Sequence, residues 1–146
     1  MSNLALRSLP CMCATLRRCA RALTQQYEDA LRPLGLRGSQ FTILQALELA
    51  GEVSQGQLGE ILAMDSTTLT RTLDIMARHG WITKRSGRDR RERHLRLAKA
   101  GKVQLNRALP AWQKVQSRLR RQFGDRRWDQ LMKLTNEVTS TVTDEE

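Results

Sequence analysis

Two groups of side chains that lie close together in the sequence could bind a nucleic acid. The first combines small hydroxyl residues with one arginine, and the second consists of arginines alone. The first comprises Ser66, Thr67, Thr68, Thr70 and Arg71, and the second comprises Arg88, Arg90 and Arg91. Hydroxyl groups at the start of a helix hydrogen bond phosphates or base edges, and arginine reaches guanine or phosphate. By itself, the hydroxyl run would also fit an ordinary helix cap.

The charge distribution favours a polyanion as the partner. The 146 residues carry a net charge of +10. Residues 78–96 contain eight Lys or Arg residues and two acids, whereas residues 39–65 contain four acids and no Lys or Arg. A concentrated basic face attracts nucleic acid because neutralised phosphates release their counterions. For the charge alone, a solvated arginine loop remains the alternative.

The hydrophobic pattern predicts the elements that position these groups. Apolar residues recur at helical spacing in six segments and alternate with polar residues, as strands do, in two. We expect helices over about residues 10–34, 39–50, 54–62, 65–78, 98–123 and from 125 onward, and strands over 81–85 and 93–97. The predicted N-caps of the second, third and fourth helices are Ser39, Ser54, and Asp65 or Ser66. Pro110 should kink the fifth helix.

These elements predict a mainly α chain with a winged helix-turn-helix lobe over residues 37–98. The length fits a single domain, residues 1–146. The helix over 65–78 would enter the major groove of DNA with its N-terminus first, and the tip of the hairpin would reach the adjacent minor groove. A hydroxyl-rich helix and an arginine hairpin at this spacing therefore predict binding to double-stranded DNA. A basic protein that binds nucleic acid without sequence preference is the alternative.

The composition disfavours several other classes of protein. Hydrophobic residues make up 40% of the chain, which is typical of a folded protein, and no apolar run approaches the roughly 20 residues of a membrane span. We find no phosphate-binding glycine loop, nucleophile elbow or histidine–glutamate metal motif, so we expect neither an enzyme nor a cofactor. Three cysteines clustered near the start form a poor disulfide framework and indicate a reducing cytoplasm.

The block "VSQGQLGEILAMDSTTLTRTLDIMARHGWITKRSGRDRRERHLRLAKAG" closely resembles the MarR family of bacterial transcription regulators. The family pattern is a D-R-R triplet, alternating strand residues, and a leucine-threonine-x-x-glycine. Here the pattern reads Asp89, Arg90 and Arg91, then Leu95, Leu97 and Gly101, with Ala98 in place of the threonine.

The resemblance implies a function and an assembly. It implies that Asp89 braces Arg91, and that Arg88 and Arg90 contact the minor groove. It implies a homodimer held by residues 1–36 and 99–146, which would read a roughly palindromic operator and act as a repressor. Members of the family respond to small anionic or phenolic effectors, and no motif here identifies one.

The cysteines suggest what the regulator could sense. The segment "CATLRRCARALTQQYEDALRPLGL" is similar to the first helix of the organic-hydroperoxide sensors in the same family, which implies that Cys13 reacts with oxidant and that Tyr27 hydrogen bonds its sulfur. Arg17 replaces the second tyrosine of those sensors and would favour a thiolate. The pattern places Cys13 and Cys19 on the buried stripe of the helix. A purely structural role, in which both are small buried hydrophobic residues, is therefore an alternative to sensing. Binding of a soft metal or metalloid by Cys11, Cys13 and Cys19 is a further alternative.

Overall fold

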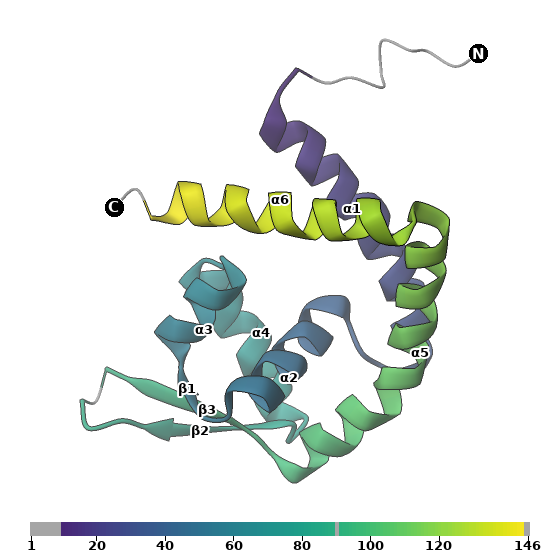
Figure 1. The fold of residues 1–146 in the computed structure, drawn as a ribbon. Helices are drawn as coiled ribbons and strands as arrows, with labels where there is room; N and C mark the ends of the chain where they lie inside the picture. Colours follow the sequence, from purple (N-terminus) through teal and green to yellow (C-terminus); the bar gives the residue numbers. More distant parts are fainter. Residues whose placement is uncertain (1–9, 90, 145–146) are drawn as a thin grey trace.

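The computed structural model describes residues 10–89 and 91–144, and this part of the chain is mainly helical with one small antiparallel sheet (Figure 1). The elements follow one another as α1 (Met12–Leu31), a short 3-10 turn (Arg32–Leu34), α2 (Gly38–Ala50), β1 (Val53–Ser54), α3 (Gln55–Leu62), α4 (Ser66–Arg78), β2 (Ile82–Ser86), β3 (Arg93–Leu97), α5 (Lys99–Phe123) and α6 (Asp125–Thr143). The predicted mainly α, winged helix-turn-helix fold is confirmed.

The helix-turn-helix consists of α3 and α4, and each helix begins at a side-chain cap. Ser54 accepts a 3.1 Å hydrogen bond from the Gln57 amide, and Asp65 accepts one of 2.9 Å from the Thr68 amide. The turn between the helices contains Ala63 in the left-handed region, with φ 51°. The predicted caps at Ser54 and Asp65 are therefore confirmed.

The cap predicted at Ser39 is wrong, because α2 begins at Gly38 and its N-cap is Arg37, two residues before Ser39. Two other groups already satisfy the free amides at this end of the helix. Glu28 of α1 accepts from the Gly38 amide at 2.7 Å, and the Gln40 side chain accepts from the Arg37 amide at 2.9 Å.

The sheet forms the wing, which we define as β2, β3 and the loop 87–92 between them. The strand order is β1-β3-β2, and all pairs are antiparallel. β3 pairs with β2 over five residues, from Ile82↔Leu97 to Ser86↔Arg93, and with β1 at Val53↔Leu95. The sequence prediction missed β1, because two residues are too few to show an alternating pattern.

The core of the lobe lies between α2, α3, α4, the sheet and the first half of α5. Its fully buried side chains include Leu44, Leu58, Leu69, Leu73, Met76 and Leu95. Phe41 of α2 packs on Trp112 of α5 with ring centroids 5.8 Å apart, so the lobe is fixed to α5. Pro110 lies inside α5, which continues through it and bends along its length in Figure 1.

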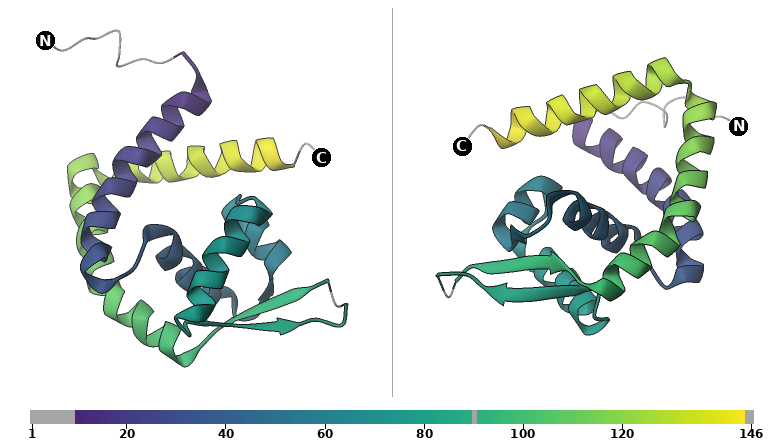
Figure 2. Two further views of the ribbon diagram at one scale, coloured as in Figure 1. Left: turned by 180° about the vertical axis from the view of Figure 1, so that it is seen from behind. Right: turned by 60° about the horizontal axis from the view of Figure 1, so that its bottom comes forward.

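The helices outside the lobe, α1 and α6, leave apolar side chains uncovered. α1 packs against α5 through a Tyr27–Gln116 hydrogen bond and a 2.9 Å bond from Arg118 to Gln26. Both α1 and α6 project beyond the lobe in Figures 1 and 2. Their exposed apolar side chains are Met12, Leu16 and Leu23 of α1 and Met132, Leu134 and Val142 of α6. No helix in the described part of the chain is long and apolar enough to span a membrane.

Candidate nucleic-acid interface

The hydroxyl residues singled out in the sequence lie on the first two turns of α4. Ser66, Thr67, Thr68, Thr70 and Arg71 are all exposed. The Thr70 hydroxyl accepts a 2.8 Å hydrogen bond from the Gln55 side-chain amide on α3. Thr70 therefore links the two helices of the motif, whereas the sequence pattern suggested only a DNA contact.

The loop of the wing is organised by Asp89. Its carboxylate accepts a 3.1 Å hydrogen bond from the main-chain amide of Arg91, and its carbonyl accepts one of 2.9 Å from the Glu92 amide. Asp89 therefore contacts Arg91 through the main-chain amide, and no ion pair joins the two side chains in the described part of the chain. Arg88 and Arg91 are exposed, and Arg90 lies outside the described residues.

A cleft of about 1060 Å³ lies between α3, α4 and the wing, and Thr143 at the end of α6 also lines it. Its lining residues include Gln55, Glu60, Ser66, Thr70, Asp74, Lys84, Arg91, Glu92 and Arg93. Of the predicted contacts, the cleft thus brings together Ser66, Thr70 and Arg91. Thr67, Thr68, Arg71 and Arg88 lie outside its lining, on the exposed surface of α4 and the wing.

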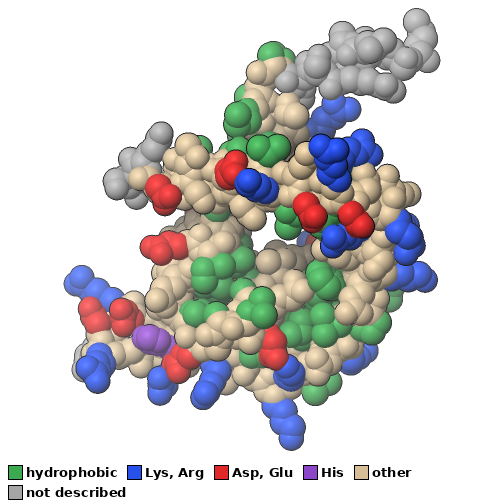
Figure 3. Space-filling view, viewed as in Figure 1, with side chains coloured by type: hydrophobic (Ala, Val, Ile, Leu, Met, Phe, Trp, Pro, Cys, Tyr) green, Lys and Arg blue, Asp and Glu red, His purple; other side chains and the backbone are tan. Residues whose placement is uncertain are grey.

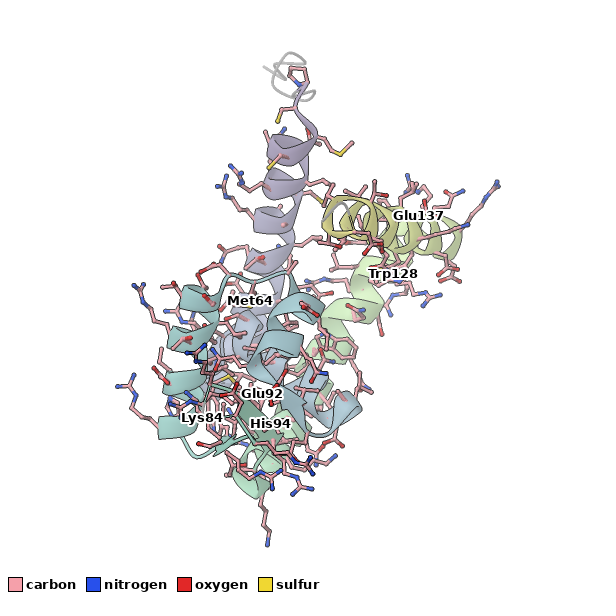
Figure 4. The ribbon with its side chains drawn as sticks, turned by 90° about the vertical axis from the view of Figure 1, so that its left-hand side faces the viewer. Met64, Lys84, Glu92, His94, Trp128 and Glu137 are labelled. Atoms are coloured by element: carbon pink, nitrogen blue, oxygen red, sulfur yellow. The ribbon has the colours of Figure 1, made fainter. Side chains whose placement is uncertain are left out.

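The sequence prediction missed two groups of residues that line this cleft. Lys84 and Arg93 belong to the basic segment, but the sequence analysis did not distinguish them from its other cations. Their positions in the two strands could have indicated that both side chains lie on the face of the sheet that lines the cleft. Gln55 gave no signal, because its partner Thr70 is 15 residues away and on another helix. Figure 4 shows Lys84, Glu92 and His94 close together on the lobe, far from Trp128 and Glu137 on α6.

Acidic side chains hold several of the basic residues in place. Lys84 of β2 donates to Asp74 of α4. The pKa of Asp74 is held below its ordinary value, first by that hydrogen bond and then by the positive charge of Lys84. At the base of the wing, Glu52 accepts from Arg85 at 2.6 Å. Figure 3 shows Lys and Arg side chains along the wing and the lower edge of the lobe, with Asp and Glu side chains between them.

His94 of β3 lies between two carboxylates at the base of the wing. Its Nε2 is 3.4 Å from Glu92, and its Nδ1 is 3.9 Å from Glu52. The described part of the chain contains no group of three or more His, Cys, Asp or Glu side chains arranged to hold a metal ion.

A second cavity, of about 530 Å³, separates α1 from the lobe. Its lining includes Tyr27, Arg37, Phe41, Gln45 and Trp112. The pKa of Tyr27 is raised because its phenol is partly buried there. The cavity therefore offers aromatic faces, the Arg37 guanidinium and the Glu28 carboxylate, which accepts from the Gly38 amide.

The cysteines lie on the surface of this single chain, contrary to the buried stripe that the sequence predicted. Cys11, Cys13 and Cys19 are all exposed, because the first half of α1 extends beyond its contact with α5. Cys11 precedes the helix as its N-cap and accepts from the Ala14 amide at 3.5 Å. Arg17 donates to the Cys13 sulfur at 3.2 Å, which places the predicted cation beside it.

The predicted hydrogen bond from Tyr27 to the Cys13 sulfur is not made within one chain. The two residues lie 14 positions apart on α1, which corresponds to about 21 Å of helix. The Tyr27 hydroxyl instead donates to Gln116 of α5.

Comparisons with known proteins agree with this architecture. A family model described as "MarR family" matches residues 34–92. An uncharacterized HTH-type transcriptional regulator, YwoH of Bacillus subtilis (strain 168), is 32% identical over 80 residues. That match covers 55% of this chain and 58% of the relative, so it spans little more than half of either protein.

Solved structures match over nearly the whole chain. The transcriptional regulator MosR of M. tuberculosis, crystallised in complex with DNA, is 33% identical with a TM-score of 0.82, and the match covers 92% of this chain and 97% of MosR. A second structure of MosR is 31% identical with a TM-score of 0.80 and the same coverage. A mutant MarR from E. coli complexed with operator DNA is 21% identical with a TM-score of 0.76, covering 84% of this chain and 89% of MarR, and it shows likeness of fold.

Proposed function

The chain belongs to the MarR family of DNA-binding transcription regulators, and from this premise we propose that it represses transcription as a homodimer bound to a roughly palindromic operator. The observation that carries the proposal is the cleft between α4 and the wing. It brings hydroxyl groups of α4 and cations of the wing to one surface. MosR, which this chain matches over 97% of its length, was crystallised with DNA.

In this proposal α4 enters the major groove and the wing reaches the adjacent minor groove. Thr67, Thr68 and Arg71 are exposed on α4 and free of the cleft, so they are the proposed groups for base edges. Ser66 and Thr70 line the cleft and would contact phosphate oxygens. Arg88, Arg90 and Arg91 would supply the cations of the wing.

The exposed apolar side chains of α1 and α6 support the dimer. Met12 is 66% exposed, Leu134 60% and Val142 65%, and large apolar side chains on two neighbouring helices usually mark a protein interface. We propose that the domain is divided accordingly, with residues 37–98 binding DNA and residues 1–36 and 99–146 forming the dimer. A symmetric dimer would place two α4 helices about 34 Å apart, one turn of DNA.

Selection of binding sites from random duplex DNA tests this function. The selected sites should be inverted repeats with half-sites one helical turn apart, and unrelated RNA should compete poorly. Sedimentation should give a mass of twice 16.7 kDa. Equal binding to every duplex and to RNA would instead identify a non-specific basic protein, and stable single subunits would contradict the dimer.

A thiol switch is favoured by the contact between Cys13 and Arg17. The Cys13 sulfur is exposed and accepts from a guanidinium, and redox-sensing thiols share this accessibility and positive surrounding. In the proposed switch, an organic hydroperoxide transfers one oxygen to the Cys13 thiol, which becomes a sulfenic acid, and its O–O bond breaks to leave the alcohol. The modified α1 would then change the dimer and release the operator.

A cysteine series tests this switch. Cys13→Ser should bind the operator normally and remain bound after treatment with hydroperoxide, whereas Cys19→Ser should still be released. Release that persists in Cys13→Ser would remove Cys13 from the switch. Release by a soft metal or metalloid without oxidant would favour the metal-sensing alternative, in which Cys11, Cys13 and Cys19 act together.

The cavity between α1 and the lobe is the proposed site for a small effector. Arg37 would pair with an anionic group, and the rings of Phe41 and Trp112 would cover an aromatic one. Binding of salicylate, followed by Trp112 fluorescence and weakened in Arg37→Gln, which keeps the fluorophore, would support this site. An unchanged fluorescence at millimolar salicylate would argue against this class of ligand.

A further inference from the structure

An ion pair joins the DNA-facing helix to the wing inside the cleft. Asp74 lies one turn after Thr70 on α4, and its carboxylate accepts from the Lys84 ammonium on β2. Alternate side chains of a strand point to opposite faces, so Lys84 shares its face with Ile82, which is buried against the lobe. The Lys84 side chain is accordingly only 21% exposed. The pair is therefore part of the wall between α4 and the wing.

Asp74 remains negatively charged at neutral pH. Its pKa is lowered by the hydrogen bond from Lys84 and by the positive charges of Lys84, Arg78 and Arg93. A permanent negative charge in a cleft proposed to hold phosphates opposes DNA binding. The Asp74 carboxylate therefore lowers the affinity for DNA, so we look for its role in the structure of the lobe.

Side-chain bonds hold α4 on two sides. Gln55 of α3 donates to Thr70 at 2.8 Å, and Asp74 accepts from Lys84 of β2. The two residues of α4 are one helical turn apart and line the same cleft. The first bond sets α4 relative to α3, and the second sets α4 relative to the wing.

We propose that Asp74 is a positioning residue which, through Lys84, fixes the spacing between α4 and the wing and thereby discriminates the operator from other DNA. The inference rests on the proposed operator binding. With the pair made, the helix and the wing fit adjacent grooves at one spacing, and a duplex of different groove geometry loses one of the two contacts. With the pair broken, the wing adjusts to either duplex, and selectivity falls.

The experiment compares Asp74→Asn with Glu60→Gln, measuring the dissociation constants for the selected operator and for random duplex. Glu60 lines the same cleft and makes no ion pair within the described residues. Each variant therefore removes one negative charge from this cleft, but only Asp74→Asn also removes an ion pair. Both should bind random duplex at least as tightly as the natural chain. Only Asp74→Asn should lower the selectivity ratio, which is the dissociation constant for random duplex divided by that for the operator, by about threefold or more, as expected for residues in direct contact.

Variants of Lys84 test the same link from the other side. Lys84→Met keeps the packed stem but removes the ammonium, so it should lower the ratio as Asp74→Asn does, and the double variant should lower it no further. Lys84→Arg retains a cation and should keep the natural ratio. Thermal unfolding of each variant, measured in parallel, separates loss of selectivity from loss of structure.

Two outcomes overturn the inference. If Asp74→Asn and Glu60→Gln give the same ratio, Asp74 contributes only its charge. If the double variant lowers the ratio by the product of the single effects, the two residues act independently of each other. A natural chain that prefers no duplex would instead contradict the proposed function itself, which this design detects before any variant is compared.

Discussion

Replacing Gly101 with alanine should destabilise the junction between the wing and α5. A Cβ atom at this position would lie 2.0 Å from the Trp81 carbonyl oxygen and 2.9 Å from the Leu97 Cδ1 atom. The Trp81 oxygen also accepts a 2.9 Å hydrogen bond from the Ala98 amide, just before α5 begins. The added methyl group therefore meets main-chain atoms that cannot rotate away.

The expected loss of stability follows from the size of this overlap. Carbon and carbonyl oxygen approach to about 3.3 Å in ordinary contacts, so the Trp81 main chain must retreat by roughly 1 Å. Overpacking of this kind costs about 1–3 kcal/mol, and contact with main chain puts Gly101→Ala at about 3 kcal/mol. For a chain of this size that free energy lowers the unfolding midpoint by roughly 6–12 °C.

Thermal unfolding at one fixed protein concentration measures the effect, since dimerisation makes the midpoint depend on concentration. Two glycines of α3 are matched controls. A Cβ at Gly56 has its nearest neighbour at 3.9 Å, and one at Gly59 has its nearest neighbour at 3.4 Å. Gly56→Ala should raise the midpoint by roughly 1–4 °C, because alanine favours a helix by about 0.5–1 kcal/mol. Gly59→Ala should fall between the other two.

The order of the three unfolding midpoints is the decisive result. A Gly101→Ala midpoint within about 2 °C of the natural chain would refute the close approach of α5 to Trp81. Equal losses in all three variants would show that chain flexibility, and not the contact, determines the effect. A Gly101→Ala chain that does not fold while both controls do agrees with the contact.

Further predictions concern the DNA contacts and the helix-turn-helix. Arg71→Ala should weaken operator binding by about 1–3 kcal/mol and relax base preference. Arg90→Ala should weaken binding to all duplexes and lower by about one the slope of log affinity against log salt concentration. Gel shifts at several salt concentrations measure both effects, and unchanged affinities in both variants would contradict the groove assignment. Ala63→Gly should raise the unfolding midpoint, because glycine adopts the left-handed conformation of the turn without strain; a lower midpoint would argue against that conformation. Asp65→Ala should lower the midpoint at neutral pH, since the hydrogen bond from Thr68 lowers the pKa of Asp65 in the folded state. The difference in unfolding midpoint between Asp65→Ala and the natural chain should be fully present above the ordinary aspartate pKa of about 3.9. It should vanish as the pH falls through the lowered pKa of Asp65 in the folded state. A difference that does not change with pH would exclude the carboxylate as its source.

Local patterns in the sequence were sufficient for most of the secondary structure. Ser54 and Asp65 cap their helices through amides three residues away, and β2 and β3 alternate their side chains over five residues each. Such features depend on neighbours in the chain, so they can be read without knowing the fold. The two-residue β1 and the start of α2 could not be predicted in this way, because both depend on distant partners, β3 for the one and Glu28 for the other.

The sequence by itself therefore determined the order of the six α-helices and of β2 and β3, the basic wing and the hydroxyl-rich start of α4. Only the tertiary structure decided how these groups are held, because the bonds that hold them join residues from different elements. Gln55 meets Thr70, Asp74 meets Lys84, and α1 extends past α5 and leaves Cys13 on the surface. Periodicity reports which face of an element is apolar, but it does not report which distant element covers that face or leaves it open.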